Sequence, residues 1–161
     1  MLKTTETYLC ITMNIRKAIL GDAEAIATQN ILLAKESEQL ILYVKTVFAG
    51  VNALLSDKKK GFYIVAEEDN EIIGQMMITF EWSDWRNANI WWIQSVYVQK
   101  KWRKKKIFTK LFDYIQQQAC QHHVSILRLY TYESNTVAQA VYQQIGMQKE
   151  PYMFYQKTIK K

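Results

Sequence analysis

Six of the seven residues from Lys100 to Lys106 are basic, within the stretch VQKKWRKKKIFTKL. The formal net charge of the whole chain is +6, so these six side chains match its entire excess of positive charge. The run follows a strand-like segment and precedes a helical pattern. Free backbone N–H groups and the helix dipole make such a junction suited to an anion, and a diphosphate in particular. The residues therefore predict a seat for a small polyanion.

The segments around the basic run alternate between strand and helix patterns. Residues 90–98 are aromatic and β-branched with alternating faces, which predicts a strand, and the apolar spacing from Ile107 predicts a helix after the run. The other predicted strands are 13–22, two within 61–82 joined at Asp69-Asn70, 125–132 and 152–159, and the other predicted helices are 23–34, 36–55 and 134–145, the last capped by Ser134. This order indicates an α/β (α+β) mixed sheet with helices on both faces.

Length and composition limit the class of protein. A chain of 161 residues that is 49% hydrophobic can form one domain with a real core. We predict an N-terminal tail at 1–12 and a single domain at 13–161. No apolar run approaches the ~20 residues of a membrane helix, and the N-terminus does not read as a signal peptide, so we expect a cytoplasmic protein with no membrane partner. Cys10 and Cys120 are far apart without a CxxC partner, and no metal site is expected.

Two long stretches resemble a known family. SVYVQKKWRKKKIFTKLFDYI is similar to the acetyl-CoA-binding segment of the GNAT superfamily of N-acetyltransferases, whose signature is Arg/Gln-x-x-Gly-x-Gly/Ala at the start of a helix. LRLYTYESNTVAQAVYQQIGMQKEPYMFYQK resembles the second half of the same family, and IRKAILGDAEAIATQ fits its first strand and helix. The resemblance covers about residues 13–159. It implies a mostly antiparallel central sheet with a splayed parallel strand pair that binds acetyl-CoA.

The resemblance assigns the cosubstrate to one strand end, the junction and a later helix. The backbone of the strand would hold the pantetheine arm and the acetyl carbonyl, and the backbone of the junction would hold the diphosphate. Asn135 and Tyr142 match family residues that contact the cosubstrate after the next strand. The predicted acetyl-CoA-binding residues are Val96, Tyr97, Val98, Arg103, Lys104, Lys105, Lys106, Ile107, Phe108, Thr109, Asn135 and Tyr142.

The junction departs from the family signature at two positions. Arg103 fits the first signature position, but Lys106 and Phe108 stand where the signature has small residues. Glycine adopts positive φ easily and lets a backbone approach phosphate closely. We favour a loop that keeps negative φ throughout and whose lysines add phosphate contacts. A degenerate loop that binds CoA poorly is the alternative.

The resemblance also implies a direct transfer, in which the primary amine of the acceptor attacks the thioester without a covalent enzyme intermediate. Tyr142 matches the family tyrosine that protonates the leaving thiolate as a general acid, although its place on an apolar helix stripe also suits core packing. The strand before the junction offers no base. Glu81 is the best candidate for the general base, and Asp84 and Glu133 are weaker candidates. Each of these carboxylates could instead be solvated.

The stretch TFEWSDWRNANIWW concentrates four tryptophans and two carboxylates near where a family acceptor would enter. Aromatic faces and carboxylates suit an ammonium group, which favours a small cationic amine such as a polyamine, an aminoglycoside-like compound or a basic amino-acid derivative. A protein N-terminus or a lysine side chain is the alternative acceptor. Trp91 and Trp92 could simply pack on the two faces of the sheet. The predicted acceptor-binding residues are Glu81, Trp82, Asp84 and Trp85.

Two alternatives to an acetyltransferase remain. A non-catalytic acyl-CoA-binding protein with the same fold would explain the missing glycines and the uncertain base. A nucleic-acid-binding module would use residues 100–106, with Trp102 stacking on bases. The basic residues are confined to one junction, so nucleic acid is not the expected partner. A small-molecule amine is the expected partner, and homodimers are common in such folds, although no segment reads as a defined interface.

Overall fold

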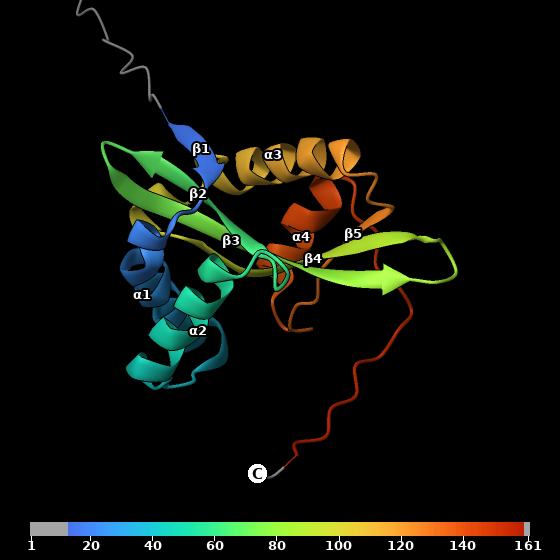
Figure 1. Ribbon diagram of the computed structural model, residues 1–161, viewed down its shortest axis with the longest axis horizontal. Helices are drawn as coiled ribbons and strands as arrows, with labels where there is room; N and C mark the ends of the chain where they lie inside the picture. Colours follow the sequence, from blue (N-terminus) through green and yellow to red (C-terminus); the bar gives the residue numbers. More distant parts are fainter. Residues whose placement is uncertain (1–12, 160–161) are drawn as a thin grey trace, which may run out of the picture. The chain divides into compact units, whose positions relative to one another are not determined.

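The computed structural model describes residues 13–159 (Figure 1). They divide into two compact units, residues 13–129 and residues 130–159, which are treated separately below. The predicted tail at 1–12 lies outside the described residues.

The first unit is built on a five-stranded sheet in the order β1-β2-β3-β4-β5. Its strands are β1 (Asn14–Lys17), β2 (Phe62–Glu68), β3 (Glu71–Ser83), β4 (Ala88–Val98) and β5 (Ile126–Arg128). The first three pairings are antiparallel, and only β4 and β5 run parallel. Asp69 and Asn70 both have positive φ in the β2–β3 turn, as a tight hairpin turn requires. The predicted mostly antiparallel mixed sheet is therefore confirmed.

Helices cover both faces of this sheet, as predicted. Figure 1 shows α1 (Ala23–Leu33) and α2 (Val44–Ser56) on one side and α3 (Ile107–Gln121) on the other. Apolar residues at a spacing of four turn one face of α3 inward, and Leu111 and Ile115 are fully buried there. On the opposite side Ile26, Val65 and Tyr63 belong to the core between α1, α2 and β2. The two layers hold the end of β4 and the start of α3 in place.

The predicted helix at 36–55 begins much later than expected. A π-helical turn, η2 (Ala34–Glu38), continues α1, and Gln39 then takes a left-handed conformation with φ 55°. Residues 39–43 are not helical, and α2 starts only at Val44. The left-handed residue interrupts the helical hydrogen bonds, so the segment predicted as one helix forms two separate helical elements.

Two strands predicted in the last third of the sequence differ from the structure. The strand expected at 125–132 is confined to β5, and no strand forms at the predicted 152–159. Backbone groups of a strand need a partner strand, and residues 130–159 contain none. The helix α4 (Thr136–Gln144) is present, but its cap is Asn135 rather than Ser134, because the Asn135 Oδ1 accepts a hydrogen bond from the Ala138 N–H at 3.2 Å.

Candidate cofactor and active site

The junction between β4 and α3 combines a short 3-10 turn, η3 (Lys100–Trp102), with a loop that takes two left-handed residues. Lys104 has φ 63° and Lys106 has φ 60°. The expectation of negative φ throughout is therefore wrong, and the lysines adopt the conformation that glycine would take more cheaply. Arg103 braces the turn, since its Nε donates to the Val98 carbonyl at 3.0 Å and its guanidinium lies over the Tyr97 ring.

The start of α3 has free backbone donors. Lys106 occupies the N-cap position and makes no side-chain cap hydrogen bond. The first N–H groups of any α-helix have no acceptor within the helix. Phe108 is partly buried and its ring lies 6.2 Å from that of Phe112, so its side chain turns away from the loop. The first turn of α3 therefore presents its N–H groups to an anion, with the helix dipole adding to the attraction.

The six basic side chains of the run fall into two groups. Three are ion-paired with acidic residues: Arg103 lies 2.7 Å and Lys100 lies 3.6 Å from Glu36, and Lys101 lies 2.8 Å from Glu71. Lys104, Lys105 and Lys106 are exposed and have no ion-pair partner within residues 13–159. These three lysines therefore supply the positive charge for an added anion.

Glu36 links the junction to the end of α1. The Tyr97 hydroxyl donates to one of its carboxylate oxygens at 3.0 Å, and the Arg103 guanidinium donates to the other. Desolvation alone would raise the pKa of Glu36, but hydrogen bonds from Arg103 and Tyr97 outweigh it and hold the pKa below its usual value. The carboxylate stays ionised near neutral pH and keeps Arg103 oriented.

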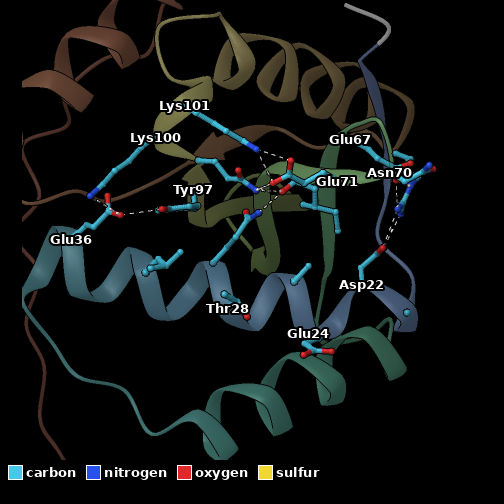
Figure 2. Close-up of a pocket in the computed structure, with 17 residues that line it drawn as sticks. Asp22, Glu24, Thr28, Glu36, Glu67, Asn70, Glu71, Tyr97, Lys100 and Lys101 are labelled. Carbon is cyan, nitrogen blue, oxygen red and sulfur yellow. Dashed lines mark hydrogen bonds and ion pairs between the residues drawn. The ribbon is translucent and has the colours of Figure 1, made fainter.

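A wide groove borders the paired half of the run (Figure 2). It has a volume of about 880 Å³ and lies between α1, the β2–β3 turn and the end of β4. Figure 2 shows Lys100 and Tyr97 facing Glu36, and Lys101 facing Glu71. These side chains pair with one another, whereas Glu24, which also lines the groove, is exposed and has no ion-pair partner within residues 13–159.

The strand β4 carries an exposed edge and a bulge just before the junction. Its parallel pairing with β5 extends only from Ile90 to Trp92, although β4 continues to Val98. Ser95 has φ 47°, and the register with β3 breaks between Gln75 and Met77. A bulge leaves backbone groups outside the ladder. Within residues 13–129, the edge of 93–98 on the β5 side has no strand partner and can pair with an extended ligand.

A hydrogen-bond network of three side chains lies behind the bulge, and two of them, Gln75 and Tyr63, are buried. The amide of Gln75 donates to Asn30 Oδ1 at 2.7 Å and approaches the Ser95 carbonyl at 3.4 Å, and Asn30 donates to the Tyr63 hydroxyl at 3.0 Å. Burial raises the pKa of Tyr63, against smaller opposite effects of its hydrogen bonds with Asn30 and Ser95. Tyr63 is thus a neutral phenol near neutral pH. The network fixes the shape of the bulge.

The predicted acceptor-binding residues lie along the β3–β4 hairpin. Glu81 is held by an Arg128 Nη1 at 3.4 Å and by the indole N–H of Trp92 at 2.5 Å. Trp82 and Trp85 are 59% and 89% exposed near the hairpin tip, where the Asp84 carboxylate accepts from the Trp85 N–H. Ala88 and the bulge at Ser95 are seven residues apart in β4, or about 23 Å along the strand. The structure does not bring the tip together with the edge of 93–98.

Asn135 and Tyr142 both belong to the second unit. The Asn135 carbonyl oxygen is used as the helix cap described above. Tyr142 lies on α4, and desolvation by burial raises its pKa, so its phenol keeps its proton near neutral pH. That is the protonation state that a general acid needs. Their roles toward the cosubstrate, and that of Glu81 as a base, stay predictions.

Sequence reasoning missed the network behind the bulge and the acid that holds Arg103. A polar Gln75 inside the apolar run IIGQMMI was an available signal, because a buried polar side chain requires partners. Glu36 gave no signal, since it meets Arg103 across 67 residues of sequence.

Two further findings concern residues 13–159. None of their helices has the length and apolar character needed to cross a membrane. They also contain no cluster of three or more His, Cys, Asp or Glu side chains arranged to hold a metal ion.

The chain is similar to acetyltransferases in sequence and in structure. Residues 29–147 match the model of the acetyltransferase (GNAT) family. A possible acetyltransferase from Clostridium difficile 630 is 40% identical, with a TM-score of 0.87 over 92% of this chain and 99% of that chain. A predicted acetyltransferase with acetyl-CoA from Clostridium acetobutylicum is 22% identical, with a TM-score of 0.75 over 90% of this chain and 96% of that chain, and shares the fold.

A third structure with the same fold is a ribosomal-protein-alanine N-acetyltransferase from Brucella melitensis biovar Abortus 2308, 18% identical, with a TM-score of 0.74 over 91% of this chain and 99% of that chain. A search among curated proteins found no match. The family match spans more than half of the sequence, including the β4–α3 junction and α4. The chain therefore belongs to the acetyltransferase (GNAT) family and is an N-acetyltransferase.

Proposed function

We propose that this enzyme transfers an acetyl group from acetyl-CoA directly to the primary amine of a small acceptor. One observation carries the proposal: an uncapped helix N-terminus and three lysines without an ion-pair partner in residues 13–159 stand at the end of a strand edge that has no partner strand within residues 13–129. An elongated molecule with a diphosphate at one end and an amide-rich arm fits such a surface. Acetyl-CoA has this form and supplies an activated acetyl thioester.

The chain's own groups divide the binding between two segments. The backbone N–H groups from Arg103 to Thr109 would hold the diphosphate, and Lys104, Lys105 and Lys106 would add charge around it. The backbone of Val96 to Val98 would pair with the pantetheine arm. An N–H group there would also face the carbonyl oxygen, where negative charge develops during transfer.

The transfer requires two proton movements that side chains must manage. The acceptor nitrogen has to lose a proton before its lone pair forms the new C–N bond, and the C–S bond breaks as that bond forms. The departing thiolate then needs a proton, for which Tyr142 is the proposed donor. Glu81 pairs with Ile90 in β4, six residues before Val96, so it is the proposed acceptor of the proton from nitrogen through a chain of water molecules, with Arg128 holding its carboxylate in place.

The test is isothermal titration of the folded protein with acetyl-CoA at near-physiological salt, followed by thiol release with a set of amines. We expect saturable one-to-one binding and amine-dependent release of CoA. Absence of binding in a demonstrably folded sample would refute the proposal. Salt-sensitive binding of nucleic acid in place of acetyl-CoA would instead support a nucleic-acid-binding module.

A further inference from the structure

A second groove opens beside the bulge of β4, on the side of α1 and α2. It has a volume of about 360 Å³, within the range of small-ligand pockets, and we call it the Tyr63 groove. Its walls come from α1, α2, β3 and the non-helical segment 39–43. Most of its lining is apolar, with Leu33, Leu40, Leu42, Val47, Leu54 and Met77 among the side chains.

One end of the Tyr63 groove is polar, and it adjoins the proposed reaction site. Asn30, Tyr63 and Ser95 line this end. Their hydrogen-bond network, described above, holds them in fixed positions. Ser95 directly precedes Val96, the first of the residues whose backbone is proposed to hold the thioester. A molecule lying in the groove would therefore place its polar end next to the acetyl group.

The Tyr63 groove offers a single carboxylate, that of the exposed Glu38, to a second cation. Its only lining residues with ionisable side chains are Glu38 and Tyr63, and Tyr63 is neutral because burial raises its pKa. Away from Glu38, an ammonium or hydroxyl group placed against the leucine walls would lose its water without gaining a partner, which is costly. An alkyl chain or an aromatic ring would instead cover apolar surface, including that of Leu40, which is 49% exposed.

We infer that the acceptor is a monoamine with an apolar arm, an alkyl- or arylalkylamine, whose arm lies in the Tyr63 groove. This inference rests on the proposed acetyl transfer and narrows its acceptor. It differs from the sequence-based expectation of a small cationic amine, such as a polyamine, bound by Glu81, Trp82, Asp84 and Trp85. Glu81 lies opposite Ile90, and the other three lie near the hairpin tip, about 23 Å along β4 from the bulge, whereas the groove begins at the bulge itself.

A matched pair of acceptors tests the inference. Hexylamine and 1,6-diaminohexane have the same carbon chain and differ by one terminal ammonium group. With acetyl-CoA at saturation and release of the CoA thiol as the signal, we expect hexylamine to have a kcat/KM at least about ten times that of the diamine. Equal or greater kcat/KM for the diamine would overturn the inference while leaving the acetyl transfer established.

Two variants of segment 39–43 locate the arm. Leu40→Gln removes an apolar wall of the groove and should weaken hexylamine about three- to ten-fold. Ile41→Gln is the control, because Ile41 is 97% exposed, adjacent in sequence, and not part of the lining. Binding is measured by titration calorimetry on the CoA-bound protein, so the result does not depend on turnover.

The combined outcomes separate this inference from the proposed function. Leu40-dependent binding of hexylamine with turnover supports both. Leu40-dependent binding without turnover of any amine would support the groove as the site of the arm and refute the transfer. Equal hexylamine affinity in Leu40→Gln and Ile41→Gln would overturn the groove assignment, whatever the turnover.

Discussion

Lys106 has a left-handed conformation at the start of α3, at the position where the family signature has glycine. Its φ of 60° and ψ of 21° bring the Cβ close to its own backbone, whereas its neighbour Lys105 does not have positive φ. Both side chains are exposed lysines of the same loop. Comparing Gly with Ala at each position isolates the Cβ, because both substitutions remove the rest of the side chain.

The expected magnitudes follow from two opposing effects. Glycine increases the entropy of the unfolded chain and lowers the free energy of unfolding by about 0.5–1 kcal/mol relative to alanine. At Lys105 nothing offsets this loss. At Lys106 glycine also relieves a left-handed conformation that costs about 1–2 kcal/mol with a Cβ present. Lys106→Gly should therefore be at least as stable as Lys106→Ala, whereas Lys105→Gly should be less stable than Lys105→Ala.

Reversible denaturant unfolding of the four variants gives the free energy of unfolding, and thermal melts provide a second readout. The Gly-minus-Ala difference at Lys106 should exceed that at Lys105 by about 1–2 kcal/mol, which corresponds to about 2–8 °C in Tm. Because the entropy of glycine cancels between the two positions, this double difference measures the left-handed penalty alone. A double difference near zero would refute the left-handed loop and restore the expectation of negative φ.

Three further predictions concern the charges and the proposed acid. Glu36→Gln should lower the free energy of unfolding at pH 7 by less than about 1 kcal/mol. Because the pKa of Glu36 is lowered in the folded state, the extra stability of the wild type should persist above the ordinary carboxyl pKa of about 4.3 and vanish as the pH falls below it. A stability difference that grows in acid, measured by denaturant unfolding, would contradict this. The double variant Lys104→Ala/Lys105→Ala should weaken the affinity for CoA several-fold but leave the affinity for pantetheine unchanged. Lys101→Ala, which removes an ion-paired lysine, should change the affinity for CoA little in the same titrations. Equal losses of affinity for CoA and pantetheine would contradict the proposed diphosphate site. Tyr142→Phe should lower kcat about 10²-fold or more while the Kd for acetyl-CoA stays unchanged, and an unchanged kcat would exclude the acid role.

Local patterns predicted most of the first unit. The alternation in 90–98 and the apolar spacing after Ile107 correspond to β4 and α3, and Asp69-Asn70 forms the expected hairpin turn. These signals act within a few residues, since side-chain periodicity reports directly on which face is buried. The position of the basic run between a strand and a helix was likewise visible without the fold.

Tertiary structure decided which parts of the run are available to a ligand. Six basic residues look equivalent in sequence, yet Glu36 and Glu71 form ion pairs with three of them from distant segments. Tertiary structure also divided the helix predicted at 36–55. The left-handed Gln39 ends the preceding helical turn, and the non-helical segment 39–43 that follows lines part of the Tyr63 groove. Periodicity carries no information about such breaks, because the residue's neighbours in space set its φ.

The sequence by itself determined the order of strands and helices in the first unit, the position of the basic run at the β4–α3 junction and the resemblance to the acetyltransferase family. Only the tertiary structure decided that the loop is left-handed at Lys104 and Lys106, that β4 bulges at Ser95, and that an apolar groove rather than the tryptophan-rich tip adjoins the bulge. Secondary-structure signals arise from contacts within a turn or a strand pair. A binding site joins residues from several elements, and their meeting depends on packing across the whole sheet.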